Sequence, residues 1–212
     1  MVAGNDAGLA AALERQAGDK NITAVRAALS DDAANGTARR DRLDGGSTPL
    51  EWKSSPISAR SLVLAAHNRL GSLDAAVLVC SPLRRFPAGL PDAFEIDTAI
   101  DMYVKSYMFV TRELLSHFTK QGGGLLAFVV RGGGGPDGGT LDKTITAAFA
   151  AFAEALLGTQ GVENLIGFSA DIPPASEQTD AFAAFILKLI TDERKNDRGR
   201  WHKFGKLNLF GR

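Results

Sequence analysis

The sequence has a single cysteine, no net charge and no long hydrophobic run. The lone Cys80 excludes an internal disulfide and a cysteine-rich zinc site. Basic and acidic residues number 24 each, so the chain lacks the excess positive charge typical of proteins that bind nucleic acid. No apolar run approaches the roughly 20 residues that span a bilayer, and the first residues do not form a basic segment followed by a hydrophobic one. We therefore expect a cytoplasmic protein with neither a nucleic-acid nor a membrane partner.

Metal ligands are equally scarce. The three histidines, His67, His117 and His202, lie far apart in the sequence, and none has a cysteine or carboxylate at ligand spacing. The pattern around His67 is that of a helix-surface residue without a partner. The sequence predicts no metal site.

What the chain does contain is an alternation of apolar strands and amphipathic helices. With 212 residues, 45% of them hydrophobic, and no Pro-rich or Ser-rich linker, it forms one predicted domain, 1–212. The alternation predicts an α/β fold with a doubly wound, mostly parallel, Rossmann-like sheet. Only Met1 to Ala3 remain for the first strand, so we expect that strand to be truncated. The later predicted strands are 22–29, 50–53, 74–80, 125–130, 164–168 and 206–210, and the later helices are 55–70, 97–119, 141–157 and 176–193.

Glycines follow the short first strand in the order G-x-x-x-G-x-A, formed by Gly4, Gly8 and Ala10. A strand, a glycine turn and a helix start together form a phosphate cradle, because backbone N–H groups face the ligand. An alanine-rich helix preceded by glycines also arises by chance, and this alternative stays open. In such a fold an acidic residue near the second strand holds the ribose, and a basic residue suits a 2′-phosphate; the alternative is that all are solvated loop charges. The candidates are Asp31 and Asp32 for the ribose and Arg26, Arg39 and Arg40 for the phosphate.

The most informative stretch runs from Gln121 to Lys143, where a buried-type strand is followed by a glycine-rich loop and a helix. Ligands of parallel sheets bind beyond the carboxyl ends of the strands, so this loop lies where an active site is expected. The loop contains no Ser, Tyr, His or Cys. Its charged residues, together with those of the following helix start, are Arg131, Asp137, Asp142 and Lys143.

Taken in this order, the elements resemble those of the short-chain dehydrogenase/reductase family over nearly the full length. The resemblance rests on Leu73-Asp74 before the fourth strand, on Val110-Thr111-Arg112 with His117, on the three glycines at 122–124, and on the interval from Lys143 to Gly161-Val162. It implies NAD or NADP as the cofactor, if the chain binds one, held by Gly4, Gly8, Asp31 and Lys143.

The family's reaction uses a tyrosine, a lysine four residues later, a serine and an asparagine. Carried over by position, Lys143 matches the lysine, whereas Gly139 stands in place of the tyrosine. Arg131 lies in the neighbourhood of the serine, and Tyr103 stands in place of the asparagine. The segments 78–81 and 169–170 also depart from the family's motifs.

Two hypotheses follow. The first is a non-catalytic relative that acts as a scaffold, a subunit partner or a ligand or nucleotide binder. The alternative is an NAD(P)-dependent oxidoreductase in which Tyr103 or Tyr107 is the acid, Lys143 lowers its pKa, and Arg131 polarises the substrate or holds its carboxylate. Both tyrosines could instead be buried between helices, and Lys143 and Arg131 could be surface residues.

The helix predicted at 141–157 is apolar on nearly all sides, with Phe149 and Phe152 among its large residues. A helix of this kind must be covered on both faces. We therefore expect a homodimer or homotetramer that associates through helices 97–119 and 141–157.

Overall fold

The computed structural model describes residues 1–29, 48–81, 86, 89–132, 139–159, 164–173, 177–192 and 198–205. Its centre is one seven-stranded sheet in the order β3-β2-β1-β4-β5-β6-β7, in which each pair of neighbouring strands is parallel. The predicted doubly wound α/β fold is therefore confirmed. The strands are β1 (Val2–Gly4), β2 (Arg26–Leu29), β3 (Leu50–Trp52), β4 (Ala75–Cys80), β5 (Leu125–Gly132), β6 (Leu165–Asp171) and β7 (Trp201–Phe204).

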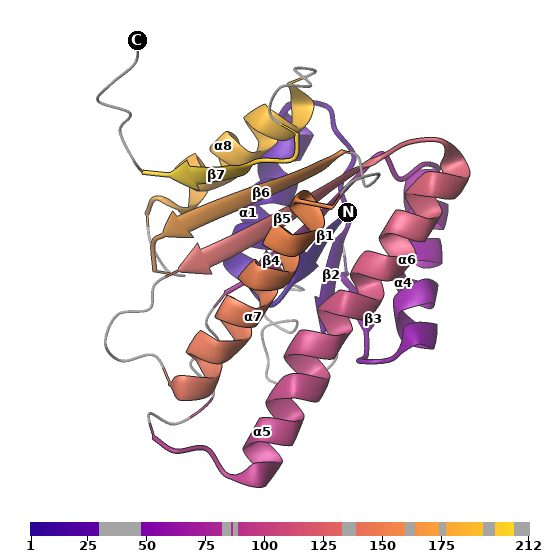
Figure 1. The fold of residues 1–212 in the computed structure, drawn as a ribbon. Coiled ribbons are helices and arrows are strands. Elements are labelled where there is room, and N and C mark those ends of the chain that lie inside the picture. The colour runs from indigo at the N-terminus through magenta and orange to yellow at the C-terminus, as the bar shows by residue number, and fades with distance from the viewer. Residues whose placement is uncertain are drawn as a thin grey trace.

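Helices cover both faces of this sheet (Figure 1). On one face lie α1 (Ala7–Asp19) and α8 (Thr179–Thr191), which contribute Leu9, Leu13 and Phe182 to one apolar core. On the other lie α4 (Pro56–Leu70), α6 (Ser106–Gln121) and α7 (Thr140–Leu157), whose apolar residues form a second core. Because β4 and β5 are covered on both sides, their residues read as continuous apolar runs rather than alternating ones.

Local sequence signals explain the limits of several helices. Ser55 caps α4 by accepting a hydrogen bond from the Ser58 backbone N–H, and Pro56 occupies the first turn. Gly71 ends this helix at a φ of 78°, a conformation that glycine adopts without steric cost. The long predicted helix 97–119 is an almost continuous helical arm built from α5 (Ala93–Ala99), a π-helical stretch η1 (Ile100–Lys105) and α6. In Figure 1, α5 extends beyond the sheet.

Three sequence predictions need adjustment. The second strand begins at Arg26 rather than at Ile22, since residues 22–25 form no regular structure. The last described strand is Trp201–Phe204, whereas the predicted strand 206–210 lies outside the described residues. His67 is not a partnerless surface residue: its ring meets that of His117 edge to face, with 5.1 Å between the ring centroids, where α4 packs on α6.

The aromatic residues of α7 pack within the protomer. Phe149 is buried against Phe128 of β5 and Tyr107 of α6, and Phe152 also contacts Phe128. The exposed side of α7 carries small residues such as Ala147 and Ala151. An association through this helix would therefore use the alanine side, not the phenylalanines.

Strand β1 lies between β2 and β4, so the sheet is wound in opposite directions on its two sides. The register places Gly4 opposite Val79, Cys80 opposite Val130, and Arg131 opposite Ala170. The carboxyl ends of β1, β4, β5 and β6 thus meet along one edge. In open α/β sheets, ligands bind at such a point of reversal. Among the described residues, no helix is both long and apolar enough to cross a bilayer.

Candidate functional site

The turn between β1 and α1 is the predicted phosphate cradle, and its first glycine is required by the sheet itself. A Cβ at Gly4 would lie 2.1 Å from the carbonyl oxygen of Val79 in the neighbouring strand. No side chain fits at that distance. Gly4 therefore permits the close contact between β1 and β4, and the glycine signal has a structural cause that does not involve a nucleotide. Gly8 lies exposed in the first turn of α1.

A carboxylate from the chain itself occupies the N-terminus of α1. Asp6 is the N-cap residue, and its Oδ1 accepts a hydrogen bond of 2.9 Å from the backbone N–H of Leu9. Its other oxygen, Oδ2, accepts a hydrogen bond of 2.7 Å from the Ser81 hydroxyl, just after β4. Asp6 is 6% exposed. A negative charge is favourable here because the first N–H groups of a helix lack partners within the helix and its dipole is positive at this end.

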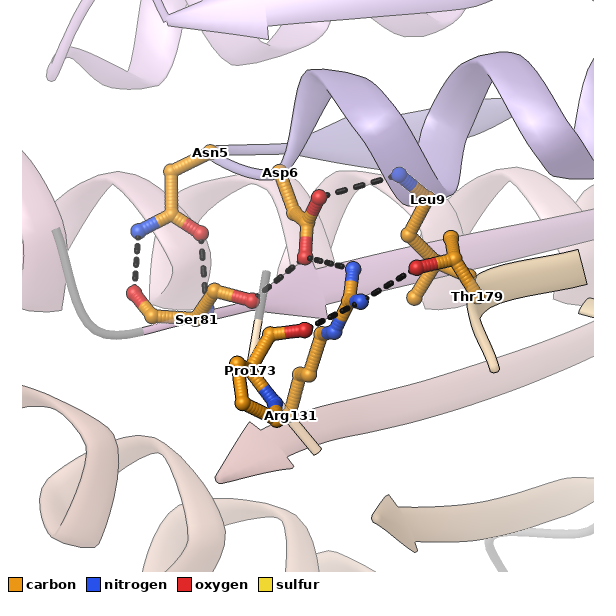
Figure 2. Close-up of polar contacts among 7 residues, drawn as sticks. All are labelled: Asn5, Asp6, Leu9, Ser81, Arg131, Pro173 and Thr179. Atoms are coloured by element: carbon orange, nitrogen blue, oxygen red, sulfur yellow. Dashed lines mark hydrogen bonds and ion pairs between the residues drawn. The ribbon is translucent and has the colours of Figure 1, made fainter. Parts of the chain in front are cut away.

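The charge of Asp6 is balanced by Arg131, at the end of β5. The Arg131 Nη1 atom lies 2.9 Å from Asp6 Oδ2, and the exposed fractions of the two side chains are 0% and 3%. Nη2 of the same guanidinium donates to the carbonyl oxygen of Pro173, at 2.7 Å, and to the hydroxyl of Thr179, the first residue of α8 (Figure 2). One buried arginine thus joins the start of α1, the end of β5, the segment after β6 and the start of α8.

A second contact closes the same edge between β1 and β4. The Asn5 side-chain amide donates to the Ser81 carbonyl oxygen at 2.8 Å, and the Ser81 backbone N–H donates to Asn5 Oδ1, also at 2.8 Å (Figure 2). We refer to Asn5, Asp6, Ser81 and Arg131 together as the edge network. Hydrogen bonds within the network link Asn5 to Ser81, Ser81 to Asp6 and Asp6 to Arg131 at the point where the sheet reverses.

Both predicted acid tyrosines lie in the core. Tyr103 is 1% exposed and Tyr107 2% exposed. The Tyr107 hydroxyl donates a hydrogen bond of 2.6 Å to the Val79 carbonyl oxygen, and its ring packs edge to face on Phe149. The Tyr103 ring packs edge to face on Phe86. Both side chains are thus buried, as in the alternative of burial between helices, and the Tyr107 hydroxyl also reaches β4.

The helix that follows the glycine-rich loop begins at Thr140, with Gly139 as its N-cap residue. Lys143 lies in the first turn with its side chain exposed. Its neighbour Asp142 is buried, at 1% exposure. The structure thus places the predicted lysine at the surface and the predicted phenols in the interior.

Other candidate residues have different surroundings. Arg26, considered for a 2′-phosphate, forms an ion pair with Glu14 of α1 and is 5% exposed. Asp31 lies outside the described residues. Cys80 is fully buried, and burial raises the pKa of its thiol to about 12, against a smaller opposing effect of Thr146. This is the inert, buried thiol that its apolar strand predicts. Within the described ranges, no three metal-ligating side chains come together.

The sequence analysis missed Asp6, Asn5 and Ser81. Two of the three could have been suspected: Asp6 stands at the start of an apolar helical pattern, which is the position of an N-cap, and Ser81 directly follows a buried strand. The pairing of Asp6 with Arg131 had no such signal, because 125 residues separate them in the sequence.

Comparisons with known proteins agree on the fold. No protein-family model and no curated protein matches the sequence. An NADPH-dependent 3-quinuclidinone reductase from Rhodotorula rubra has a TM-score of 0.63 and 14% identity, covering 95% of this chain and 88% of its own. Levodione reductase has a TM-score of 0.64 and 14% identity, covering 96% of this chain and 95% of its own. Over nearly its whole length, the chain is thus similar in fold to these two reductases.

Proposed function

We propose that this protein is a non-catalytic member of the reductase-like fold, in which the edge network occupies the place of a nucleotide pyrophosphate. The observation that carries the proposal is the position of the Asp6 carboxylate. It holds the Leu9 N–H and the Arg131 guanidinium, the two kinds of group that a phosphate would use at this point. The chain would then keep the fold for its surfaces rather than for hydride transfer.

Electrostatics support this reading. A phosphate placed at the start of α1 would come close to the Asp6 carboxylate. Two unit negative charges 4 Å apart repel each other by about 4 kcal/mol at an effective dielectric constant of 20. The nearby Arg131 charge reduces this repulsion, but because Arg131 is paired with Asp6, the pair offers a phosphate no net positive charge. The helix dipole likewise acts on a carboxylate that is already in place.

The chemistry points the same way. Gly139 offers no proton, and general acid catalysis contributes on the order of 10²- to 10⁴-fold to rates. The Tyr107 hydroxyl donates to a backbone carbonyl, and Lys143 is exposed. Arg131, proposed in the alternative mechanism to polarise a substrate, is fully buried and bonded to Asp6, Pro173 and Thr179.

As a scaffold, the protein would act through association with itself, as a homodimer or homotetramer formed by the helices of 97–119 and 141–157. The exposed alanines of α7, Ala147, Ala151 and Ala155, support close approach of a second helix because they present little bulk. Sedimentation at micromolar concentration tests this part separately. A monomer there would contradict it.

Titration with NADH and NADPH tests the main proposal. We expect no change in nucleotide fluorescence and no rise in melting temperature, whereas a ligand at 100 times its dissociation constant stabilises a fold by about 2.7 kcal/mol. An NADPH-dependent reductase of the same fold serves as the positive control. The variant Asp6→Ser keeps a capping side chain but removes the charge. Asp180→Asn removes an exposed carboxylate at α8 and is the matched control.

Nucleotide binding by the unmodified chain at micromolar concentration would refute the proposal that the edge network occupies the place of the pyrophosphate. We call this arrangement the closed cradle. If reduction of a panel of carbonyl compounds accompanied that binding, the oxidoreductase alternative would take its place. Binding without turnover would leave a nucleotide-holding scaffold.

A further inference from the structure

A cavity of about 650 Å³ opens at the opposite edge of the sheet, where the strands begin. Its lining includes Val2 and Ala75, the first residues of β1 and β4, and Leu125, the first residue of β5. Asn164, just before β6, completes this row. The cavity is therefore separated from the edge network by the length of the strands, and it belongs to a surface for which neither the fold nor the proposed function assigns a role.

The inner wall of the cavity is apolar. Leu13 and Ala17 of α1, Val77 of β4 and Leu187 of α8 line it, and all four are buried. These residues belong to the apolar core between the sheet and helices α1 and α8, which the cavity enters at the amino ends of the strands. The wall suits a hydrocarbon body, since contact there removes apolar surface of the ligand from water.

One arginine is among the residues that line this space. Arg198 lines the cavity, and its Nη1 atom is buried with no hydrogen-bond partner among the residues that the structure describes. A buried donor without a partner costs free energy, more so when it is charged. Asp74, the acidic residue of the lining, already accepts a hydrogen bond of 3.1 Å from Ser72. An anion bound in the cavity would supply the acceptor that Arg198 Nη1 lacks.

Two further residues of the lining have an uncommon backbone conformation. Asn21 and Asn164 have φ values of 57° and 60°, and they are the two non-glycine residues with positive φ among those described. Asn21 follows the end of α1, where this conformation is common. Asn164 immediately precedes β6 and lines the cavity.

The Met1 amino group also borders the cavity, and it does not compete with Arg198 for an anion. It donates a hydrogen bond of 2.9 Å to the Ala75 carbonyl oxygen. Burial lowers the pKa of this amine to about 5, so it is uncharged at neutral pH.

We propose that this cavity binds an organic carboxylate with an apolar body, whose carboxylate accepts from Arg198 and whose hydrocarbon part contacts Leu13, Ala17 and Val77. The volume lies within the range of about 300 to 1,000 Å³ typical of small-molecule sites. An arginine binds a carboxylate through two parallel hydrogen bonds, which gives both affinity and orientation. The site is independent of the nucleotide question, so either proposal can fail alone.

Octanoate is the probe, and isothermal titration calorimetry with the full chain is the measurement. We expect saturable binding of octanoate and much weaker binding of octylammonium, which has a hydrocarbon chain of the same length and the opposite charge. Arg198→Gln is expected to weaken octanoate binding on the order of 10- to 100-fold, as removal of a charge-assisted hydrogen bond does. Arg200→Gln is the matched control, because Arg200 is exposed and does not line the cavity. That variant should bind as the unmodified chain does.

A second variant keeps the proposal testable if Arg198→Gln folds poorly. Thr191→Trp places a large ring at the rim while leaving Arg198 intact, and it should block octanoate without altering the circular dichroism spectrum. In ¹⁵N-edited spectra, octanoate should shift the amide signals of Val2, Ala75 and Leu125. Absence of binding at millimolar octanoate, equal affinity for octylammonium, or equal losses in the Arg198 and Arg200 variants would each overturn the assignment.

Discussion

The buried pair of Asp6 and Arg131 provides the sharpest test of the site. Asp6→Asn removes the charge but leaves an oxygen that can still accept from the Leu9 N–H, so the helix cap is largely kept. Arg131 then remains fully buried, and its remaining acceptors among the described residues are the Pro173 carbonyl and the Thr179 hydroxyl. Breaking a buried pair by removing one partner costs about 3–5 kcal/mol, because the other charge stays uncompensated.

For a chain of this size, each kcal/mol lowers the melting temperature by about 2–4 °C, so the expected fall for Asp6→Asn is roughly 6–20 °C. Equilibrium unfolding in urea, followed by circular dichroism, gives the free energy directly. The matched control is Asp180→Asn, which breaks the pair with Arg15. That pair also joins α1 to α8, but its side chains are 61% and 63% exposed. Loss of such an exposed pair costs about 0–1 kcal/mol.

A double variant separates the charge effect from packing. Asp6→Asn combined with Arg131→Met removes both charges, so it should be less destabilised than Asp6→Asn alone, in the manner of coupled neighbours. If Asp6→Asn unfolds within 1 kcal/mol of the unmodified chain, or if the double variant shows purely additive losses, the two residues are not a buried, coupled pair. The closed cradle would then lose its physical basis.

Three other predictions concern packing and pH. Gly4→Ala should lower the free energy of unfolding by about 3 kcal/mol or more, because the added Cβ meets a backbone oxygen at 2.1 Å; Gly18→Ala, where nothing lies within 4 Å, should be neutral or stabilising in urea unfolding. Cys80 should resist alkylation in the native protein at pH 8 and react fully in denaturant, since burial raises its pKa to about 12; labelling of the native thiol at the denatured rate contradicts this. Burial, followed by the charge of the neighbouring His67, lowers the pKa of His117 below its ordinary value of 6.5. Below pH 6.5 the unfolded chain therefore binds more protons than the folded chain, so the free energy of unfolding should fall as the pH drops. His117→Gln should flatten that pH dependence.

The sequence was sufficient for most of the fold, and the reason is visible in β4 and β5. Strands covered on both faces require continuous apolar runs, and the runs at 74–80 and 125–130 match the observed limits within one or two residues. The limits of α4 were equally readable, since Ser55, Pro56 and Gly71 each act through local geometry. The start of β2 was not, because Ile22, Thr23 and Val25 have strand-like side chains although the residue register with β1 begins at Arg26.

The candidate site was less predictable because its main interactions join distant parts of the chain. Arg131 was singled out from its place at the end of a strand, yet nothing in the local sequence indicated that it would be buried against Asp6. Gly4 was read as part of a phosphate cradle, whereas the structure shows that its neighbour Val79 requires a glycine there in any case. A motif of small residues can thus persist for packing reasons after, or without, a ligand.

Restoring the missing phenol tests whether the closed cradle or the absent acid limits the chemistry. Gly139 has φ −57° and ψ 156°, a conformation open to any residue, but it is buried, so circular dichroism must first show that Gly139→Tyr folds. It would place a tyrosine four residues before Lys143, which is the spacing that the resembling family uses. We expect no NADPH consumption with a panel of carbonyl compounds, because the Leu9 N–H and Arg131 remain bonded to Asp6 and no nucleotide is held. Adding Asp6→Ser to this variant frees the N-terminus of α1, and Asp180→Asn in its place is the control. Activity in Gly139→Tyr alone would mean that the cradle is open in the unmodified chain and that only the acid is missing. Activity that appears only when Asp6→Ser is added would show that the Asp6 carboxylate excludes the nucleotide.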